Sequence, residues 1–492
     1  MLTLWSMFFS CAGILFLLSI IRRWMFDKLS RFPGPWIASY TGLYRAYYDV
    51  IRSGCLLTQL EKLHEEYGPV VRIGPNELHF QSSAAYFDIY CHGNLTKEPT
   101  LYNSFPFHEA SISYVDRQDA ARRRELLGPL FSRTAILKFE FVIQEKIDRL
   151  IARLEENNGD VFDFHMAIRS ATIDIIAQYC FASSFHALDF ERFQHPILVG
   201  LQTGVTSSWI LKYIPVMLTA LENAPDWLID CLPRENQFFR DMRLYAAKQI
   251  EMYLASPDCL NLADQQTIFH HLLSSPRNKP SQTSLMGETM ALLAAGHDTV
   301  GGAFTVGAYH ILSNVKIHQR LVRELQDIWP DPHSPMTYET LEKLPYLTAV
   351  IKESLRLSHA GVVSNLPRVT GEPMNIGGYD IPRGTVVSMS AVFMHWNPSI
   401  FHEPLVFNPE RWLKPNSADL SKYLVSFSRG SRMCLGSLAW CELYLLFGHI
   451  FRRMNLTPVK IAEKDYKTFR DFFVPVWDGN RLHIRVNPMS DD

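Results

Sequence analysis

The residues best suited to chemistry lie in the stretch Phe427-Ser-Arg-Gly-Ser-Arg-Met-Cys-Leu-Gly436. Cys434 stands between two glycines, which let a backbone pass close to a flat cofactor, and Arg432 supplies a fixed positive charge. The apolar run over residues 435–451 predicts a helix, and the dipole and free N–H groups at a helix start lower the pKa of a thiol. These surroundings suit a cysteine that binds a metal as a thiolate. The alternative is a buried structural cysteine in a loop.

This loop resembles the haem-binding loop of the cytochrome P-450 family. Every position that the family pattern fixes is present: Phe427, Gly430, Arg432, Cys434 and Gly436. The resemblance runs from about residue 32 to near the C-terminus. It is strongest to fungal microsomal members, judged from residues 67–77 and from the Arg-Arg-Arg segment at 122–124. It implies that Cys434 is the axial ligand of the haem iron and that the other four positions shape the cofactor loop.

A second motif, Glu353-Ser-Leu-Arg356, lies in a run that predicts a helix over residues 346–357. Residues three apart face the same way on a helix, so Glu353 and Arg356 can pair. The motif alone is weak, but the block Phe-Asn-Pro-Glu-Arg-Trp at 407–412 follows it. The resemblance implies that Arg411 of this block joins the pair. The expected triad is structural and needed for haem incorporation rather than catalytic.

A third motif, Ala-Gly-His-Asp-Thr at 295–299, lies inside an apolar run that predicts a long helix over residues 285–312. Gly, Asp and Thr are poor helix formers, so the step is unusual there. An acid beside an alcohol suits a site that meters protons, whereas the alternative is a kink with a threonine back-bond. The resemblance implies that Asp298 and Thr299 are catalytic. Thr299 would hydrogen-bond the oxygen being activated, and Asp298 would supply protons.

Arginines are candidates for binding the haem propionates, because a guanidinium fork matches a carboxylate. The resemblance assigns this role to Arg124, Arg368 and Arg432. Position 120, where the family usually has Trp or His, is alanine here. Arg122 and Arg123 are expected on a solvated helix face, with reductase docking as the alternative role.

The stretch after Cys434 departs from the family pattern. A Leu-Ala pair and a glutamate arrive one residue early, as Leu438, Ala439 and Glu442. A one-residue deletion turns a helix by roughly 100°. Either a tighter turn near Ser437 absorbs the deletion, or the helix packs differently on the haem. An error in the gene model at a splice junction is a third explanation.

The elements that position these motifs are predominantly helical. Residues 70–73 and 77–80 predict a hairpin, and residues 373–387 predict a second β region. Residues 37–492 contain no internal repeat or long linker, so they predict one large catalytic domain, mainly α with small β-sheets. The resemblance implies the cytochrome P-450 fold. His395 is expected to be a satisfied structural histidine rather than a ligand.

The N-terminus predicts a membrane anchor. Residues 2–21 carry no charge and are about long enough to cross a bilayer, and positive residues follow them. No small-residue cleavage site is evident, so a transmembrane signal anchor is favoured over a cleaved signal and a secreted enzyme. Residues 22–36 predict a basic, Pro-rich hinge. We expect a single-pass protein of the endoplasmic reticulum membrane with its catalytic domain facing the cytosol, so that the sequons at Asn94 and Asn455 stay unmodified.

Composition narrows the classes of function. The 492 residues are 47% hydrophobic, which allows a large core. A formal net charge of −2 without a long basic run argues against a nucleic-acid partner. The eight cysteines include no CxxC pair and fit a reducing compartment. No dinucleotide-binding motif is present, so any electrons that the reaction needs must come from a separate protein.

The resemblance implies haem b (iron protoporphyrin IX), electrons from NADPH through a separate reductase, and insertion of one oxygen atom from O2 into a lipophilic small molecule. By family position, the pocket draws on residues 102–114, 201–209, 291–299, 362–366 and 473–477. A terpenoid or polyketide intermediate of secondary metabolism is the expected substrate. One alternative is a haem-thiolate isomerase or dehydratase that needs no O2, against which the acid–alcohol pair argues. The other is a catalytically inactive haem-binding membrane protein.

Overall fold

The computed structural model describes residues 27–92, 95–156, 159–233, 237–255, 267–274, 280–415, 417–462 and 464–487. The predicted anchor at 2–21, the first part of the predicted hinge and Asn94 lie outside these residues. Within the described ranges, no helix is long and apolar enough to cross a membrane. By its contacts the chain forms two compact units, Met1–Thr96 with Asn365–Met389 and Lys97–Ser364 with Ser390–Asp492.

The first unit is built around a five-stranded sheet with the order β1-β2-β8-β5-β3. Its strands are β1 (Val70–Gly74), β2 (Glu77–Phe80), β8 (Val386–Ser388), β5 (Arg368–Val369) and β3 (Thr96–Lys97). The predicted hairpin is confirmed, with β1 and β2 antiparallel. A second hairpin, β6 (Met374–Ile376) and β7 (Tyr379–Ile381), turns through Gly377 and Gly378 at φ 58° and 89°, so the predicted second β region is confirmed too. The helices are α2 (Trp36–Tyr40), α3 (Leu43–Ala46), α4 (Leu56–Tyr67) and α5 (Ser83–Phe87), with π-turns η1 (Tyr47–Ile51) and η2 (Asp88–His92).

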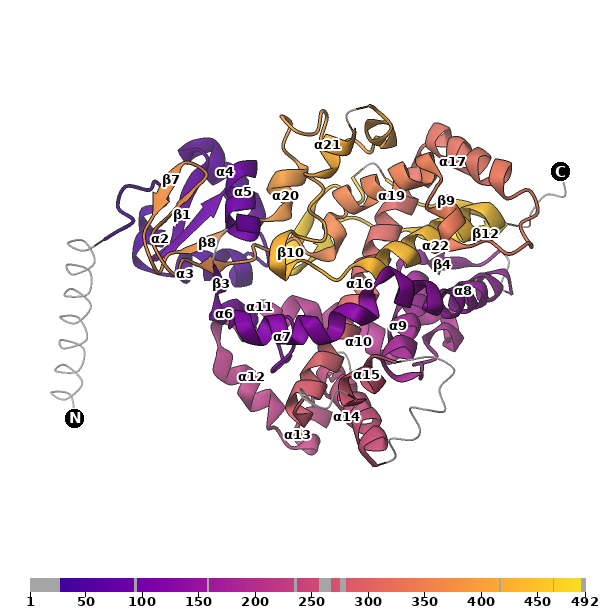
Figure 1. Ribbon diagram of the computed structural model, residues 1–492, viewed down its shortest axis with the longest axis horizontal. Helices are drawn as coiled ribbons and strands as arrows, with labels where there is room; N and C mark the ends of the chain where they lie inside the picture. The colour runs from indigo at the N-terminus through magenta and orange to yellow at the C-terminus, as the bar shows by residue number, and fades with distance from the viewer. Residues whose placement is uncertain are drawn as a thin grey trace. The chain divides into compact units, whose positions relative to one another are not determined.

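The second unit is mostly helical, which confirms the predicted fold class (Figure 1). Its helices up to α15 are α6 (Pro99–Tyr102), α7 (Arg117–Leu127), α8 (Arg133–Glu155), α9 (Phe164–Phe181), α10 (Pro196–Gly204), α11 (Ser208–Tyr213), α12 (Pro215–Glu222), α13 (Asp226–Asp230), α14 (Phe238–Ala255) and α15 (Ile268–Ser274). The later ones are α16 (Gln282–Ser313), α17 (Val315–Ile328), α18 (Tyr338–Leu341), α19 (Pro345–Leu357), α20 (Ala391–His395), α21 (Ser417–Ser421) and α22 (Ser437–Arg453). Two small antiparallel sheets complete it, β4-β12-β9 (Val161–Asp163, His483–Asn487, Asn455–Val459) and β10-β11 (Phe469–Phe472, Val474–Trp477).

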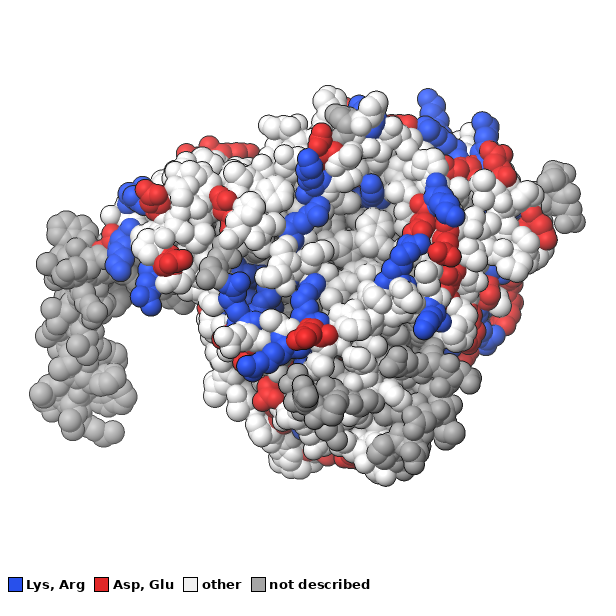
Figure 2. All heavy atoms as spheres, viewed as in Figure 1, with Lys and Arg blue, Asp and Glu red and all other residues white. Residues whose placement is uncertain are grey.

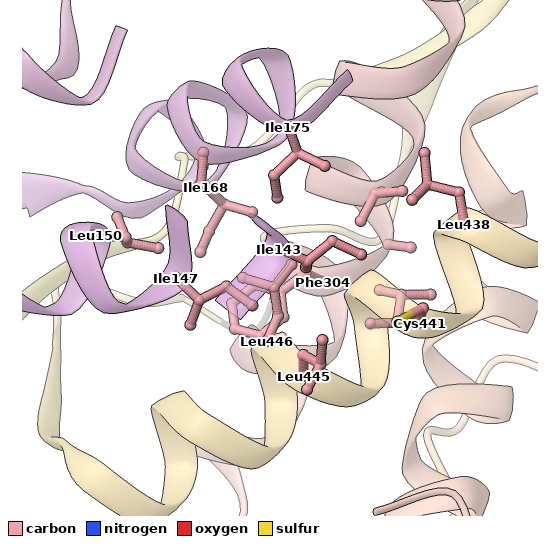
Figure 3. Packing of buried hydrophobic residues seen from close by; sticks show 14 of the residues in the cluster. Ile143, Ile147, Leu150, Ile168, Ile175, Phe304, Leu438, Cys441, Leu445 and Leu446 are labelled. Atoms are coloured by element: carbon pink, nitrogen blue, oxygen red, sulfur yellow. The ribbon is translucent and has the colours of Figure 1, made fainter. Parts of the chain in front are cut away.

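Helices α8, α9, α16 and α22 enclose the main core. Apolar residues on α8 recur at the spacing of one helix face, as in Ile143, Ile147 and Leu150, and all three are fully buried. Figure 3 shows these side chains directed toward Phe304 of α16 and Leu446 of α22. The packed core therefore fixes α16 and α22, the helices that carry or follow the predicted motifs.

Glycines let α16 lie close to its neighbours. A Cβ at Gly307 would collide with Ser354 of α19 and with Phe447 of α22, and one at Gly296 would collide with Ile176 of α9. The ring of Phe304 lies 4.5 Å from that of Phe447. The helix predicted over 285–312 runs unbroken from Gln282 to Ser313, so the middle of α16 is held rigidly beside the other core helices.

Candidate active site

The cysteine loop folds back on itself. Cys434 N–H donates to the carbonyl of Phe427 (2.9 Å), and Gly430 takes a φ of 78°, which favours glycine. Gly436 N–H points to Cys434 Sγ at 3.4 Å. Burial raises the pKa of the Cys434 thiol, while this N–H, the Arg124 guanidinium and Leu435 N–H oppose the rise. Cys434 is nevertheless an exposed residue, so packed side chains do not cover it completely.

A tight turn lies at the place of the missing residue after Cys434, and the three explanations for the deletion stay predictions. Helix α22 begins at Ser437, and Ser437 N–H donates to the carbonyl of Leu435 (2.6 Å). Gly436 lies against the ring of Phe427, where a Cβ would come within 2.6 Å of a ring carbon. That ring lies 5.7 Å from Trp440 of α22. The loop and the helix thus remain packed together despite the deletion.

The shifted glutamate is buried without a partner. Glu442 is 1% exposed, and neither carboxyl oxygen has a hydrogen-bond partner among the described residues. Burial raises the pKa of Glu442 well above its ordinary value. A charged carboxylate in such a place is strongly disfavoured, so the side chain is held as the neutral acid.

We therefore expect Glu442→Gln to stabilise the protein increasingly as the pH rises. A folded-state pKa above the unfolded value makes stability fall as the pH rises from about 4.5, because the unfolded carboxyl ionises first. Glutamine does not titrate, so its advantage in free energy of unfolding should grow between pH 4.5 and pH 7. Urea unfolding at pH 4.5 and pH 7 measures it, with the exposed Glu251→Gln as the control. A difference that does not change with pH would show that Glu442 ionises in the folded state.

The middle of helix α16 includes an accessible stripe beside buried residues. Ala295 is exposed although Leu293 and His297 beside it are buried, and Thr299 and Gly302 follow on the same face. Thr299 Oγ1 donates to the carbonyl of Ala295 (2.8 Å), which is the back-bond considered as the alternative for this motif. The accessible stripe lies at the predicted oxygen-activating step and opens into space rather than into packed side chains.

The 3-10 turn η9 (His359–Gly361) closes one side of this space. Gly361 takes a φ of 82°, and a Cβ there would lie 2.8 Å from the Cα of Thr299. Only glycine fits so close an approach in a left-handed conformation. The backbone of η9 therefore walls the space next to the Thr299 side chain.

Asp298 belongs to an ion-pair cluster with α9. Its carboxylate lies 3.1 Å from Arg169 Nε and 3.6 Å from His165 Nε2. Burial raises the pKa of Asp298, but Arg169, His165 and His297 together lower it by more than burial raises it. The pKa of Asp298 therefore lies far below the ordinary value. Asp298 is thus a carboxylate at neutral pH and carries no proton of its own. Any proton that it passes toward Thr299 must first come from a neighbouring group.

The structure brings together Glu353 and Arg356, whose pairing the motif spacing predicts, and Arg411, which the resemblance adds to them. Glu353 Oε1 accepts from Arg356 Nη2 (2.8 Å), Arg411 Nε (3.0 Å) and the N–H of Asn408 (2.9 Å). Glu353 Oε2 accepts from Arg356 Nε and from Trp412 Nε1, both at 2.9 Å. Glu353 and Arg356 are fully buried and Arg411 is 6% exposed, so this is a satisfied buried charge cluster.

Hydrogen bonds connect the triad to the cysteine loop. Arg356 Nη1 donates to the carbonyl of His395 (3.0 Å), and His395 Nε2 accepts from the N–H of Val425 (3.0 Å). Ser426 Oγ donates to the carbonyl of Leu355 on α19 (3.0 Å). His395 is fully buried and satisfied, which confirms its predicted structural role. The triad therefore holds in place the segment, Val425 and Ser426, that leads into the cysteine loop.

The arginines predicted to bind propionates lie in different surroundings. Arg124 Nη1 donates to the carbonyl of Met433 (2.6 Å), and Arg432 Nη2 donates to that of Asp116 (2.9 Å). Arg432 is part of the cysteine loop and Arg124 of α7 contacts it, both within the second unit. Arg368 belongs to the first unit, where its guanidinium lies 5.3 Å from the ring centroid of Tyr90. Their role toward a cofactor stays a prediction.

The prediction of a solvated face is confirmed for Arg122 and wrong for Arg123. Arg122 is 64% exposed, whereas Arg123 is 6% exposed and lies 3.3 Å from Glu288 of α16. Consecutive residues on a helix differ by about 100° in direction, so adjacent arginines cannot share one face. Sequence reasoning missed Glu288, although a charged residue inside an apolar helical run was a usable signal.

Segments predicted to line a pocket meet near Phe473. The carbonyl of Phe473 accepts from the N–H of Val363 (3.0 Å), and its ring lies 4.9 Å from that of Phe105. Phe105 in turn stacks on Phe107 with the rings 5.8 Å apart. The Trp209 indole donates to the carbonyl of Asp471 in the same region. Segments far apart in the sequence thus converge into an aromatic wall.

The donor set fits a haem-thiolate centre. Among the residues that the structure describes, no group of three or more His, Cys, Asp or Glu side chains could hold a metal ion. By the family pattern, Cys434 would be the protein ligand of the iron, with the remaining ligands supplied by a cofactor. The exposure of Cys434, the close packing of Gly436 and the nearby arginines suit a flat, anionic group.

Comparison with known proteins decides the family. The cytochrome P-450 family model matches residues 47–475. The chain belongs to the cytochrome P-450 family. The cytochrome P-450 monooxygenase macH of Penicillium terrestre is 34% identical, over 93% of this chain and 92% of its own length. A conidiogenone synthase of Penicillium rubens is 32% identical over 99% of both chains. A tryptophan 6-hydroxylase of Fusarium equiseti is 32% identical over 95% of this chain and 94% of its own.

This cytochrome P-450 is therefore an oxidoreductase of the monooxygenase class, and the family implies a haem-thiolate centre. Its relatives come from fungi, in agreement with the resemblance seen in the sequence. The family also fits the mainly helical architecture with small sheets. The roles of individual site residues rest on their geometry and on the family pattern together.

Proposed function

We propose that the protein uses haem b to insert one oxygen atom from O2 into a lipophilic small molecule of fungal secondary metabolism. Electrons come from NADPH through a separate reductase. The observation that carries the proposal is that two of the predicted motifs are accessible in the folded chain, Cys434 in its loop and the Ala295–Thr299 stripe of α16. A ligand sulfur and an oxygen-activating face are what this reaction class requires.

The chain's own residues divide the work. Cys434 would hold the haem iron as a thiolate, and the haem would supply the oxygen-binding and oxygen-cleaving chemistry. The Thr299 hydroxyl donates its hydrogen bond to the Ala295 carbonyl. Its oxygen can therefore accept a hydrogen bond from a bound group, or the hydroxyl can rotate and donate one instead. Asp298 stays anionic and holds His165 and Arg169 in place. His165, 21% exposed, offers a route by which protons reach Asp298 from outside.

Substitution at the acid–alcohol pair tests these roles. We expect Thr299→Ala and Asp298→Asn to lower the turnover number about 100-fold, while NADPH consumption continues and yields hydrogen peroxide. Product formed per NADPH oxidised is the measurement. Thr289→Ala is the matched control, because Thr289 makes the same back-bond on α16 (2.8 Å to the Leu285 carbonyl) but is fully buried. Coupling as tight as in the wild type would remove the pair from the mechanism.

The pocket wall supports a lipophilic substrate. Phe105, Phe107 and Phe473 present aromatic surface, and apolar lining with a few polar groups is typical of small-molecule sites. The relatives' names, a conidiogenone synthase and a tryptophan 6-hydroxylase, denote different reactions. Similarity of this degree supports the reaction class, and the aromatic wall favours a terpenoid or polyketide intermediate.

Surface features support a membrane location with the catalytic part facing the cytosol. In the first unit, Trp36, Leu43 and Ile51 are 76%, 71% and 71% exposed on α2, α3 and η1. Clustered exposed apolar residues are typical of membrane or partner contacts.

In the second unit, basic side chains gather over α7 together with acidic ones, and they include the exposed Arg117 and Arg122 (Figure 2). This surface suits docking of an acidic reductase.

Isotope labelling tests the proposed function. The full chain, expressed with a reductase in microsomes, is incubated with lipophilic terpenoids and polyketides under 18O2. We expect a product that carries one 18O atom and forms only when NADPH is present. A product that forms without NADPH or without the label would indicate the isomerase or dehydratase alternative instead.

A further inference from the structure

A buried network ties residues 104–116, here named the 104–116 loop, to the first turns of α16. Glu288 is fully buried, and its carboxylate accepts hydrogen bonds from Ser111 N (2.9 Å) and Ser111 Oγ (2.6 Å). Arg123 of α7 lies 3.3 Å from the same carboxylate. One carboxylate is thus shared by the loop, by the helix that follows the loop, and by the helix that carries Asp298 and Thr299.

The neighbouring residues of α16 hold the loop backbone as well. A Cβ at Gly287 would collide with the carbonyl of His108, so the loop lies directly on the helix. Ser284 Oγ donates to the carbonyl of Glu109 (2.8 Å) and accepts from Arg123 Nη2 (2.6 Å). Glu109 takes a φ of 52°, in the left-handed region that non-glycine residues rarely adopt. Together these contacts hold the loop in one conformation against α16.

The electrostatics make this path costly to leave. Burial raises the pKa of Glu288, and the bonds from Ser111 and Arg123 oppose that rise. If the loop lifted away, the Glu288 carboxylate would keep its ion pair with Arg123 but lose both hydrogen bonds from Ser111. A buried acceptor that loses its hydrogen bonds costs free energy, so the intact network disfavours opening of the loop.

The held loop is the one that carries the aromatic wall. Phe105 and Phe107 precede Ser111 by only a few residues, and Phe105 contacts Phe473. Glu288 lies about three helical turns, roughly 16 Å, before Thr299 on α16, so it acts on the pocket only through the loop. Fixing Ser111 therefore fixes where the two phenylalanine rings stand.

We propose that Glu288 is a positioning residue of this monooxygenase. It holds the 104–116 loop as a stiff wall of the pocket and so limits the size of the molecules that can reach Cys434. The inference rests on the proposed function for the identity of the pocket. It adds a residue that contacts neither substrate nor cofactor.

The test compares small and bulky haem-ligating probes in the full-length protein. Glu288→Gln removes the charge, and Ser111→Ala removes one loop bond without altering α16. The matched control is Glu109→Gln, whose side chain bonds Ser281 at the exposed surface (2.7 Å). Association of imidazole and of clotrimazole is followed by the Soret shift, and amide hydrogen exchange of the loop is followed by mass spectrometry.

For both test variants we expect an unchanged CO difference band, clotrimazole association about tenfold faster, and imidazole association changed by less than about twofold. Loop peptides should exchange about tenfold faster while α19 stays protected, and Glu109→Gln should behave as the wild type. The proposal is overturned if the loop stays protected in both variants, or if Glu288→Gln loses haem while Ser111→Ala changes nothing. A wild-type protein without the CO band would contradict the proposed function, and the exchange measurement, which needs no haem, would still decide the role of Glu288.

Discussion

Cys434→Ala is expected to abolish both the strongly red-shifted Soret band of the reduced CO complex and all NADPH-dependent product formation. The reason is that the methyl side chain of alanine has no atom that can coordinate iron, and the family pattern places the iron ligand at Cys434. The thiolate also supplies the electron density that the cofactor chemistry of this family needs. The measurement is the CO difference spectrum of microsomes, together with total haem per protein.

The control for this experiment is Cys231→Ala, which removes an exposed cysteine on the surface of the second unit. It should keep the band and the activity at wild-type level. A red-shifted band that survives in Cys434→Ala would mean that another thiolate binds the iron. Absence of the band in the wild type would instead mean that the shortened turn at Leu435–Ser437 prevents haem capture.

Motifs whose members are close in sequence could be predicted well. Glu353 and Arg356 are three apart on one helix, so their pairing follows from helical geometry, and the fixed spacing of the loop pattern identified Cys434. The hairpin at 70–80 followed from local turn chemistry in the same way. In each case the deciding interaction is local or belongs to a pattern that is read residue by residue.

Contacts between distant elements could not be predicted. Arg123 and Glu288 are 165 positions apart, and no periodicity within α7 or α16 shows that these two helices face each other. The partners of Asp298, Arg169 and His165, come from α9 for the same reason, and they change the protonation state expected of the acid. Burial of a charged group depends on tertiary packing, so its partner and its pKa emerge only when the chain is folded.

Glu353→Ala is the second change with a large expected effect. It would leave Arg356 and Arg411 buried without their shared carboxylate, and it would remove the acceptor of the Trp412 indole. Breaking a buried pair in this way costs about 3–5 kcal/mol. A typical domain has a stability of about 5–15 kcal/mol in total. We therefore expect little folded, haem-containing protein, measured as haem per protein and as the thermal midpoint.

The neighbouring Glu410→Gln separates the effect of burial from that of charge. Glu410 pairs with Arg320 at the surface, where both side chains are about half exposed, and it lies one position before Arg411. Exposed pairs contribute at most about 1 kcal/mol, so this variant should keep its haem and its thermal midpoint. Equal losses in both variants would place the requirement in the local chain at 407–412. A loss confined to Glu353→Ala would place it in the buried cluster, whose bonds through His395 reach Val425 at the start of the cysteine loop.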